Sequence, residues 1–390
     1  MLIVYTTCFL SFLIFLFKKD INLKIISLFY MSFIIFVNLS TFIFNKEFTS
    51  REVNSNEALV EITLILTYFT LIFLMVNINT NSINIIECSK LKMGSVQYLL
   101  LFPAIIYIAN YAYNYGLRLD GSFILNREDR SSLDYYIYIY VTSVFAISTN
   151  SRGAKFLLLA FVLVYILSGE RMKAYMYVIT FLMLYSAIWV KNILSILILL
   201  IGFSLAQFMS ILRSGEGSGL PINDVNLTHF GEVTVSSLYL YDYQTQFTFW
   251  QNINFSIGLL FGNILPSGFL PKYMDLKHFI SSEVNIPGGG WLPVFFYSAA
   301  GYVGVISFAI ILGLFYKILI EKLSSNKNGS SMHASLYVFF VVFSSTLPNW
   351  YMYTPYQIIK LPVYALIFTF ILLNVTKLFC RKISINLNKN

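Results

Sequence analysis

Four arginines, each in a short polar segment, are the side chains of this sequence best suited to bind a phosphate. They are Arg127, Arg130, Arg171 and Arg213. A guanidinium group can hold two phosphate oxygens at once, a geometry that the ammonium group of lysine does not offer. Each of the four has an acidic neighbour along the chain. A local surface ion pair, worth about 0–1 kcal/mol, is therefore the alternative explanation for any one of them.

A group that accepts a proton is the second requirement of a transfer reaction, and His278 is one candidate. Histidine titrates near neutral pH and can act as a general base without special tuning. The carboxylate of Glu283, a few residues further along the chain, is the other candidate. A lone histidine in a loop is more often structural than catalytic. The remaining histidines are His229, in the same loop, and His333, which we expect at the surface.

Glycine-rich segments accompany these residues. Gly288, Gly289 and Gly290 precede Trp291, and further glycines alternate with polar residues directly after Arg213. Glycine lets the backbone approach a ligand closely, and free amides at the start of a helix favour an anion. A flexible hinge explains the same residues equally well.

The sequence lacks the usual motifs of metal, nucleotide and nucleic acid sites. No two histidines have metal-ligand spacing, no Asp-x-Asp pair occurs, and no glycine-rich loop ends in Lys-Ser or Lys-Thr. No basic recognition helix or zinc pattern supports binding of nucleic acid. We therefore expect no metal, no cofactor and no nucleic acid partner, and we set aside a cytosolic enzyme that consumes nucleotides.

Long apolar runs must position these residues. Of the 390 residues, 57% are apolar and 11% are charged, against about 25% charged in an average soluble domain. Crossing the ~30 Å hydrocarbon core of a bilayer takes about 20 apolar residues. The sequence predicts an all-α fold, a polytopic membrane helix bundle of about 11 spans that forms one domain over 1–390. The predicted spans are 2–17, 25–44, 58–78, 96–116, 135–150, 154–168, 174–190, 193–212, 292–316, 333–347 and 361–376.

The charges between these runs predict the orientation, because inner loops of membrane proteins are rich in Lys and Arg. With the segment after the first span placed inside, the inner segments hold 15 basic and three acidic residues, a net charge of +12. The outer segments hold 11 basic and 15 acidic residues, a net charge of −4, and the two values give the total of +8. The N-terminus is then periplasmic and the C-terminus cytoplasmic. Six of the eight arginines fall outside, against the usual bias.

One outer segment, 213–291, is much longer than the other loops and is rich in aromatic residues and glycine. We interpret 213–291 as a long periplasmic loop between two spans. Its middle part, 234–265, carries seven of these aromatic rings between Tyr239 and Phe255. An interfacial helix with its rings at the level of the lipid headgroups explains most of them. A platform on which sugars stack is the second interpretation.

Three segments give the chain a resemblance to a known family. Arg171 closes Ser-Gly-Glu-Arg at an outer span end, Arg213 begins the long loop, and Trp291 closes Gly-Gly-Gly-Trp. The last segment is followed by Tyr-Ser-Ala-Ala-Gly-Tyr-Val-Gly over 297–304. With its many spans and one long outer loop, the chain resembles the bacterial O-antigen polymerases of the Wzy type, which are related to O-antigen ligases.

The resemblance implies a glycosyltransferase of the bacterial inner membrane. Its substrates would be a growing glycan and a single repeat unit, each linked to a polyprenyl diphosphate, and membrane lipid would surround both. The resemblance is also compatible with a chain-length regulator protein as a partner. The resemblance and the residues together make Arg171 and Arg213 the groups that hold the leaving diphosphate, with Arg127 and Arg130 as secondary contacts. His278 or Glu283 would take the proton of the attacking sugar hydroxyl.

Two other functions fit the sequence. An O-antigen ligase would use the same donor with lipid A-core as the acceptor. A flippase of lipid-linked oligosaccharides would need charged side chains inside the bundle, facing a cavity that opens to alternate sides. A carboxylate-based enzyme that uses acids of the first outer loop is a weaker variant; these acids are Glu47, Glu52 and Glu57.

Overall fold

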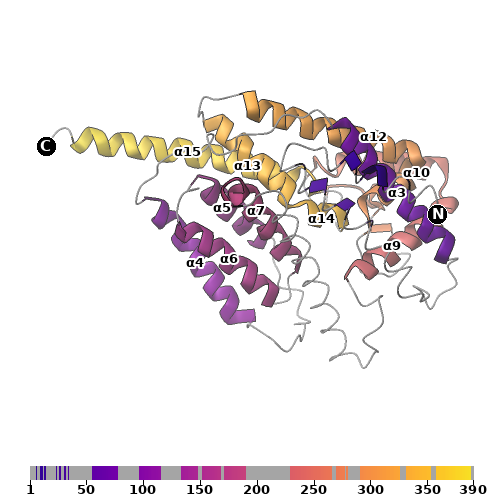
Figure 1. Cartoon of the computed structure of the whole chain (residues 1–390), viewed down its shortest axis with the longest axis horizontal. Coiled ribbons are helices and arrows are strands. Elements are labelled where there is room, and N and C mark those ends of the chain that lie inside the picture. The colour runs from indigo at the N-terminus through magenta and orange to yellow at the C-terminus, as the bar shows by residue number, and fades with distance from the viewer. Residues whose placement is uncertain are drawn as a thin grey trace.

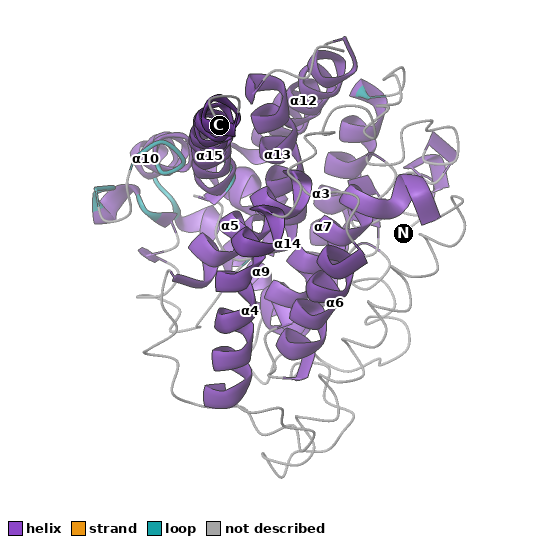
Figure 2. Ribbon diagram, turned by 90° about the vertical axis from the view of Figure 1, so that its left-hand side faces the viewer, coloured by secondary structure: helices purple, strands orange, loops and turns teal. Residues whose placement is uncertain are grey.

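The computed structural model describes several separate stretches of the chain. They are 55–77, 96–115, 133–147, 152–167, 171–189, 229–265, 269–276, 278–279, 290–325, 331–352 and 357–387, with twelve scattered positions before residue 35. Within these stretches every regular element is a helix and none is a strand, as Figure 2 shows. The predicted all-α fold class is therefore confirmed for the described residues.

Most described helices coincide with predicted apolar runs. They are α3 (Ser55–Val76), α4 (Val96–Tyr115), α5 (Leu133–Ile147), α6 (Arg152–Leu167), α7 (Arg171–Trp189), α12 (Leu292–Ser325), α13 (Ser331–Ser345) and α15 (Lys360–Leu387). Within the described residues, and by length and composition alone, two segments are long and apolar enough to cross a membrane, namely Glu57–Val76 and Leu292–Ser324. Shorter apolar helices occupy Gly153–Leu167, Lys173–Leu184, Ser331–Ser345 and Lys360–Thr376.

The described helices form two groups joined by the C-terminal elements (Figure 1). Helices α3 and α12 lie side by side at one end, and α4 to α7 lie together at the other. Helix α13 and the short α14 (Leu347–Met352) lie between the groups, and α15 packs along α13. All of α13 is buried except Met332 and Leu336. Its buried Ser335 and Ser345 hydroxyls donate to carbonyls of the preceding turn, which lets these polar side chains lie in the interior.

Ring contacts fix the relative directions of the helices in the first group. Phe69 of α3 stacks on Phe308 of α12, with ring centroids 6.1 Å apart. One turn later, Phe73 meets Tyr316 edge to face at 5.5 Å. Because both helices advance together, α3 and α12 run in the same direction.

In the second group, α4 to α7, some neighbouring helices run antiparallel and others run parallel. Helix α5 runs against α4, because Asp134 contacts Tyr107 while Tyr140 contacts the carbonyl of Leu100. Helix α5 runs with α7, since Asp134 pairs with Lys173 and Tyr138 packs on Tyr177, with ring centroids 5.1 Å apart.

Two further pairs of helices, α6 with α7 and α5 with α13, are antiparallel. Helix α6 runs against α7, because Tyr165 lies under Lys173 while Phe161 stacks on Tyr177. Helix α5 runs against α13, because Tyr138 bonds to Ser345 at the end of α13. Earlier in α5, Tyr135 donates to Asn349, which lies beyond that end.

Helix α12 is broken near its start, inside the predicted span 292–316. Ala300 has φ −148° and ψ 21°, and Gly301 has φ 60° and ψ −153°. The second conformation is essentially restricted to glycine. The break folds the first two turns back, and the rings of Phe296 and Phe308 stack with centroids 3.8 Å apart. The long straight part of α12 therefore starts at about Tyr302.

The described part of 213–291 is folded rather than an open loop. It contains α9 (His229–Tyr243), a short 3-10 turn η4 (Gln244–Gln246), α10 (Phe249–Phe261) and a second turn η5 (Lys272–Met274). Thr248 begins α10 with a capping box to Gln251. Phe247, Phe255 and Phe279 pack on one another, with ring centroids 5.2–5.7 Å apart. This small core accounts for part of the aromatic content of the segment.

Of the other aromatic residues of this segment, some are exposed and some pack against neighbouring helices. Phe249 and Trp250 are 72% and 71% exposed at the start of α10. Their exposure fits the interfacial helix predicted for most of these rings. Tyr241 of α9, in contrast, stacks on Tyr297 of α12.

The end of the long segment is held firmly by Trp291. Its backbone N–H donates to Ser237 Oγ of α9 at 2.9 Å, and its indole Nε1–H donates to Thr234 Oγ1 at 3.3 Å. All three side chains are fully buried. Helix α9 is thus fixed against the start of α12 by side chains far apart in sequence.

Candidate functional site

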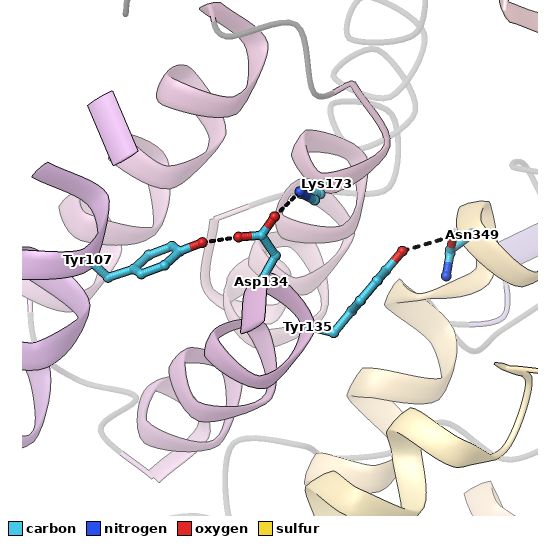
Figure 3. A network of polar contacts seen from close by, with 5 residues as sticks. All are labelled: Tyr107, Asp134, Tyr135, Lys173 and Asn349. Carbon is cyan, nitrogen blue, oxygen red and sulfur yellow. Dashed lines mark hydrogen bonds and ion pairs between the residues drawn. The ribbon is translucent and has the colours of Figure 1, made fainter. Parts of the chain in front are cut away.

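A largely buried ion pair joins the first turns of α5 and α7 (Figure 3). Lys173 Nζ pairs with Asp134 Oδ2, and the hydroxyl of Tyr107 on α4 donates to Asp134 Oδ1. The two charged side chains are 14% and 9% exposed, respectively. The Lys173 ammonium also lies 5.7 Å from the ring centre of Tyr165 on α6. One carboxylate therefore ties four helices together.

The sequence places each charge for a local reason. An acid in the first turn of α5 faces the positive end of its helix dipole, which is favourable. A lysine in the first turn of α7 lacks that advantage, and the nearby carboxylate of Asp134 compensates for it. Burial makes the pair mutually dependent, because either charge without its partner would be desolvated and unbalanced.

A second set of polar contacts lies beside the first (Figure 3). Tyr135, next to Asp134, donates its hydroxyl to Asn349 Oδ1 of α14 at 3.3 Å. The Asn349 amide donates in turn to Gln357 Oε1 at 2.8 Å. The backbone N–H of Ile358 donates to Asn263 Oδ1 at 2.9 Å, just after α10. The starts of α5, α7 and α15 are thereby connected to the part of the 213–291 segment that directly follows α10.

Lys360 adds a positive charge close to this network. It is the first residue of α15, three positions after Gln357, and is half-buried. Within the described part of the chain no carboxylate forms an ion pair with Lys360. A cation without a protein counter-ion is the kind of group that an anionic substrate can use.

Chemically, the Asp134 cluster is a positioning device. Its two carboxylate oxygens are used by Tyr107 and Lys173, and the lysine charge is matched in return. It therefore holds the start of α7 against the start of α5 and supplies neither a free base nor a free cation. The segments that carry the predicted arginines lead into α5 and α7. The cluster fixes the starts of these two helices next to each other.

Most of the predicted site residues lie outside the described residues. Arg171 is the first residue of α7, two positions before Lys173, but its side chain is outside the described part of the structure. The other predicted residues that lie wholly outside it are Arg127, Arg130, Arg213, Glu283, Gly288 and Gly289.

Two predicted site residues are described, and neither contacts the Asp134 cluster. His278 is exposed, and its backbone N–H donates to Asp275 Oδ1 at 3.1 Å. Its neighbour Phe279 packs against α10 rather than against α5 or α7. Gly290 is buried, and a Cβ there would lie 2.8 Å from the ring of Phe295. Close packing is therefore a sufficient reason for glycine at this position.

His333 contradicts its prediction. We expected it at the surface, but it is 2% exposed within α13. The reason is that α13 is central and is covered on nearly every side. His333 stands at the end of an apolar run, and that position in the sequence does not show which other helices cover the residue.

Sequence reasoning missed Asp134, Lys173 and Tyr107. The available signal was that an acid and a lysine stand one residue before two predicted spans that begin on the same side. Opposite charges at the same depth of a bundle attract, whereas exposed charges in water need not pair.

Comparison with known proteins does not identify the chain. No protein-family model, curated protein or solved structure matches it. The functional argument therefore rests on the sequence and on the geometry described above.

Proposed function

We propose that this chain is a multi-span glycosyltransferase of the bacterial inner membrane that polymerises lipid-linked oligosaccharide repeat units on the periplasmic face. An acceptor sugar hydroxyl attacks the anomeric carbon of the donor glycan. The bond between that carbon and the diphosphate oxygen breaks, and polyprenyl diphosphate leaves with the electron pair. The reaction is that of an O-antigen or other surface-polysaccharide polymerase of the Wzy type, and we propose that it needs no metal.

The helix directions support the proposed alternation of spans. In that topology α3, α5, α7 and α12 all run from the periplasm to the cytoplasm, whereas α4, α6 and α13 run outward. The observed parallel pairs are α3 with α12 and α5 with α7, and the observed antiparallel pairs include α5 with α13. Each agrees with the alternation. The Asp134 cluster and Lys360 then lie on the periplasmic side.

The observation that carries the proposal is the contact between Asp134 and Lys173. It places the first turns of α5 and α7 side by side, and these helices directly follow two of the arginine-bearing segments. Arg130 precedes Asp134 by four residues, a length of chain that reaches at most about 14 Å. Arg171 precedes Lys173 by two. Chain connectivity thus supports a shared anion site for Arg130 and Arg171 near this cluster.

The proposed roles follow from the charge that develops in the reaction. Arg171 and Arg213 bind the leaving diphosphate and stabilise its growing negative charge, with Arg127 and Arg130 as further contacts. Asp134 is matched by Lys173 and so competes little with a phosphate for these arginines. His278 or Glu283 accepts the proton of the attacking hydroxyl. The segment 213–291 holds the glycan.

The experiment compares alanine and lysine at two of the arginines in a deletion strain complemented on a plasmid. Arg171→Ala and Arg213→Ala should each shorten the polysaccharide ladder to single repeats, since loss of one such donor costs on the order of 10²–10³ in rate. Arg→Lys at the same positions should retain partial activity at most, because lysine loses the two-pronged geometry. Arg152→Ala is the matched control, because Arg152 is predicted on the cytoplasmic side and its variant should keep full-length ladders.

Protein level is checked by blotting, so that loss of protein is not read as loss of activity. Full-length ladders from both alanine variants would refute the diphosphate role. The deletion strain itself tests the reaction class. Single repeats on lipid A-core indicate a polymerase, polymer that stays on the carrier lipid indicates a ligase, and repeats trapped in the cytoplasm indicate a flippase.

A further inference from the structure

A second polar cluster surrounds Glu61 on the first turns of α3, apart from the Asp134 site. The hydroxyl of Tyr302 donates to Glu61 Oε1. Tyr297 packs edge to face on Tyr302, with ring centroids 5.0 Å apart. Tyr241 of α9 stacks on Tyr297, with ring centroids 5.8 Å apart and an interplanar angle of 21°. All four side chains are partly exposed.

The break in α12 brings these rings together. Tyr297 lies before Ala300 and Gly301 and Tyr302 lies directly after them, so the two rings come from separate helical segments that meet at an angle. In an uninterrupted helix, residues five positions apart point in directions well over 100° apart. Because Trp291, the residue directly before α12, is bonded to α9, Tyr241 is held against Tyr297.

The cluster has negative charge and no matching cation among the described residues. Glu61 forms no ion pair there, and Glu57 stands exposed one turn earlier on α3. Burial, and then the charge of Glu61, raises the pKa of Tyr241, so its hydroxyl stays protonated and remains a donor at neutral pH.

We propose that Glu61, Tyr241, Tyr297 and Tyr302 form a saccharide subsite that accepts an uncharged or amino sugar and disfavours an acidic one. Aromatic faces stack on the C–H face of a sugar ring, and the phenol and carboxylate groups bond its hydroxyls. Among the described residues, no hydrogen bond is shown for the second carboxylate oxygen of Glu61. The negative surroundings repel a sugar carboxylate. This inference rests on the proposed function, in which the substrate is a lipid-linked glycan.

A structural role for the same residues makes a different prediction. If the Glu61–Tyr302 bond only holds the break in α12, its loss lowers the stability of the protein and leaves binding by the folded protein unchanged. A binding measurement on folded protein in nanodiscs therefore separates the two roles.

The probe is a set of repeat-sized oligosaccharides, obtained by partial acid hydrolysis of the surface polysaccharide of the source strain. Binding to the purified full-length protein in nanodiscs is measured by saturation-transfer NMR and titration calorimetry. Tyr241→Ala and Tyr297→Ala should each weaken binding about tenfold, because each removes a stacking face. Tyr113→Ala is the matched control, because Tyr113 is a tyrosine on α4 that is 87% exposed and should leave binding unchanged.

The charge preference is tested with the same oligosaccharides after oxidation of their primary hydroxyls to carboxylates. Wild-type protein should bind the oxidised form at least about tenfold more weakly than the native form. Glu61→Gln, which keeps an acceptor for Tyr302 but removes the charge, should narrow that ratio several-fold. An unchanged ratio would overturn the role of Glu61.

The outcome is independent of catalysis. Equal affinity of Tyr241→Ala, Tyr297→Ala and wild-type protein for the oligosaccharides would remove the subsite even if the polymerase proposal stands. Conversely, a deletion strain that still makes full-length polymer would remove the polymerase proposal, while the binding titration would still report on the subsite.

Discussion

The buried pair of Asp134 and Lys173 gives a prediction whose size follows from the structure. Lys173→Met removes the ammonium group and keeps most of the side-chain volume, which leaves the Asp134 carboxylate 9% exposed with only the Tyr107 hydroxyl as a partner. Removing one partner of a buried ion pair costs on the order of 3–5 kcal/mol, because the remaining charge stays desolvated. We expect a loss of that size in the free energy of unfolding. Asp134→Leu should cause a similar loss by removing the carboxylate that matches the Lys173 charge.

The double variant is the decisive one. Asp134→Leu combined with Lys173→Met strands no charge, and apolar replacements of a buried pair are often neutral. We therefore expect the double variant to be more stable than either single variant, so the coupling energy between the two sites should exceed about 3 kcal/mol, the smaller of the single-variant losses. Equilibrium unfolding in mixed micelles, followed by tryptophan fluorescence, measures all four proteins. Lys272→Met, at an exposed lysine, is the control and should change stability by less than about 0.5 kcal/mol.

Additive losses from the two single variants would refute this reasoning. They would mean that the two charges are each solvated in the folded protein and do not depend on one another. The structural basis for placing the start of α7 against the start of α5 would then be lost, and with it the argument that Arg130 and Arg171 share a site.

Three further predictions test the fold, the topology and the chemistry. Gly301→Ala should destabilise the protein by about 1–3 kcal/mol through backbone strain alone, since a Cβ there meets nothing within 4 Å. Gly153→Ala, equally open but without a positive φ, should have no such cost in the same unfolding assay. Purified protein given lipid-linked repeats should polymerise them in excess chelator, and activity that magnesium restores would contradict metal independence. Reporter fusions should read periplasmic at Asn126 and Asn252 and cytoplasmic at Lys90, Lys191 and Lys327; reversal at any two would overturn the orientation.

The helices were predictable because their signal is local. In a hydrocarbon environment, a run of about 20 apolar residues can satisfy its backbone hydrogen bonds internally as a helix, and the composition of each run was enough to predict these elements. Helices α3, α4 and α7 match their predicted runs to within three residues at each end. The short run 154–168 is a helix as well, α6.

The break in α12 was not predictable from apolar composition. The run from Leu292 onward is continuously apolar, and its glycines are compatible with an unbroken helix at a modest cost each. What selects the break is tertiary contact. Trp291 is bonded to α9, and Phe296 stacks on Phe308 when the first two turns fold back. Gly301 permits that conformation, but a glycine in an apolar run does not by itself predict it.

The positioning residues were missed for a related reason. Charges next to apolar runs were read as signals of membrane orientation, which is a property of each loop taken separately. The pairing of Asp134 with Lys173 is a property of two helices whose paired residues stand 39 positions apart. No local pattern indicates that α5 and α7 are neighbours, although both begin on the predicted periplasmic side.

The form of that pair bears on why arginine stands in the flanking segments. Asp134 divides its two oxygens between two donors, so Lys173, a single point charge, is sufficient and a two-pronged guanidinium would have to displace Tyr107. Lysine thus meets the need for an ion pair within the protein on this face. Arg171 stands two residues away, in the same short segment, where a second lysine would have matched any carboxylate equally well. A partner with several equivalent oxygens, such as a diphosphate, can accept two hydrogen bonds from one guanidinium group and therefore binds arginine better than lysine. This favours a substrate role for the arginines over further internal pairing.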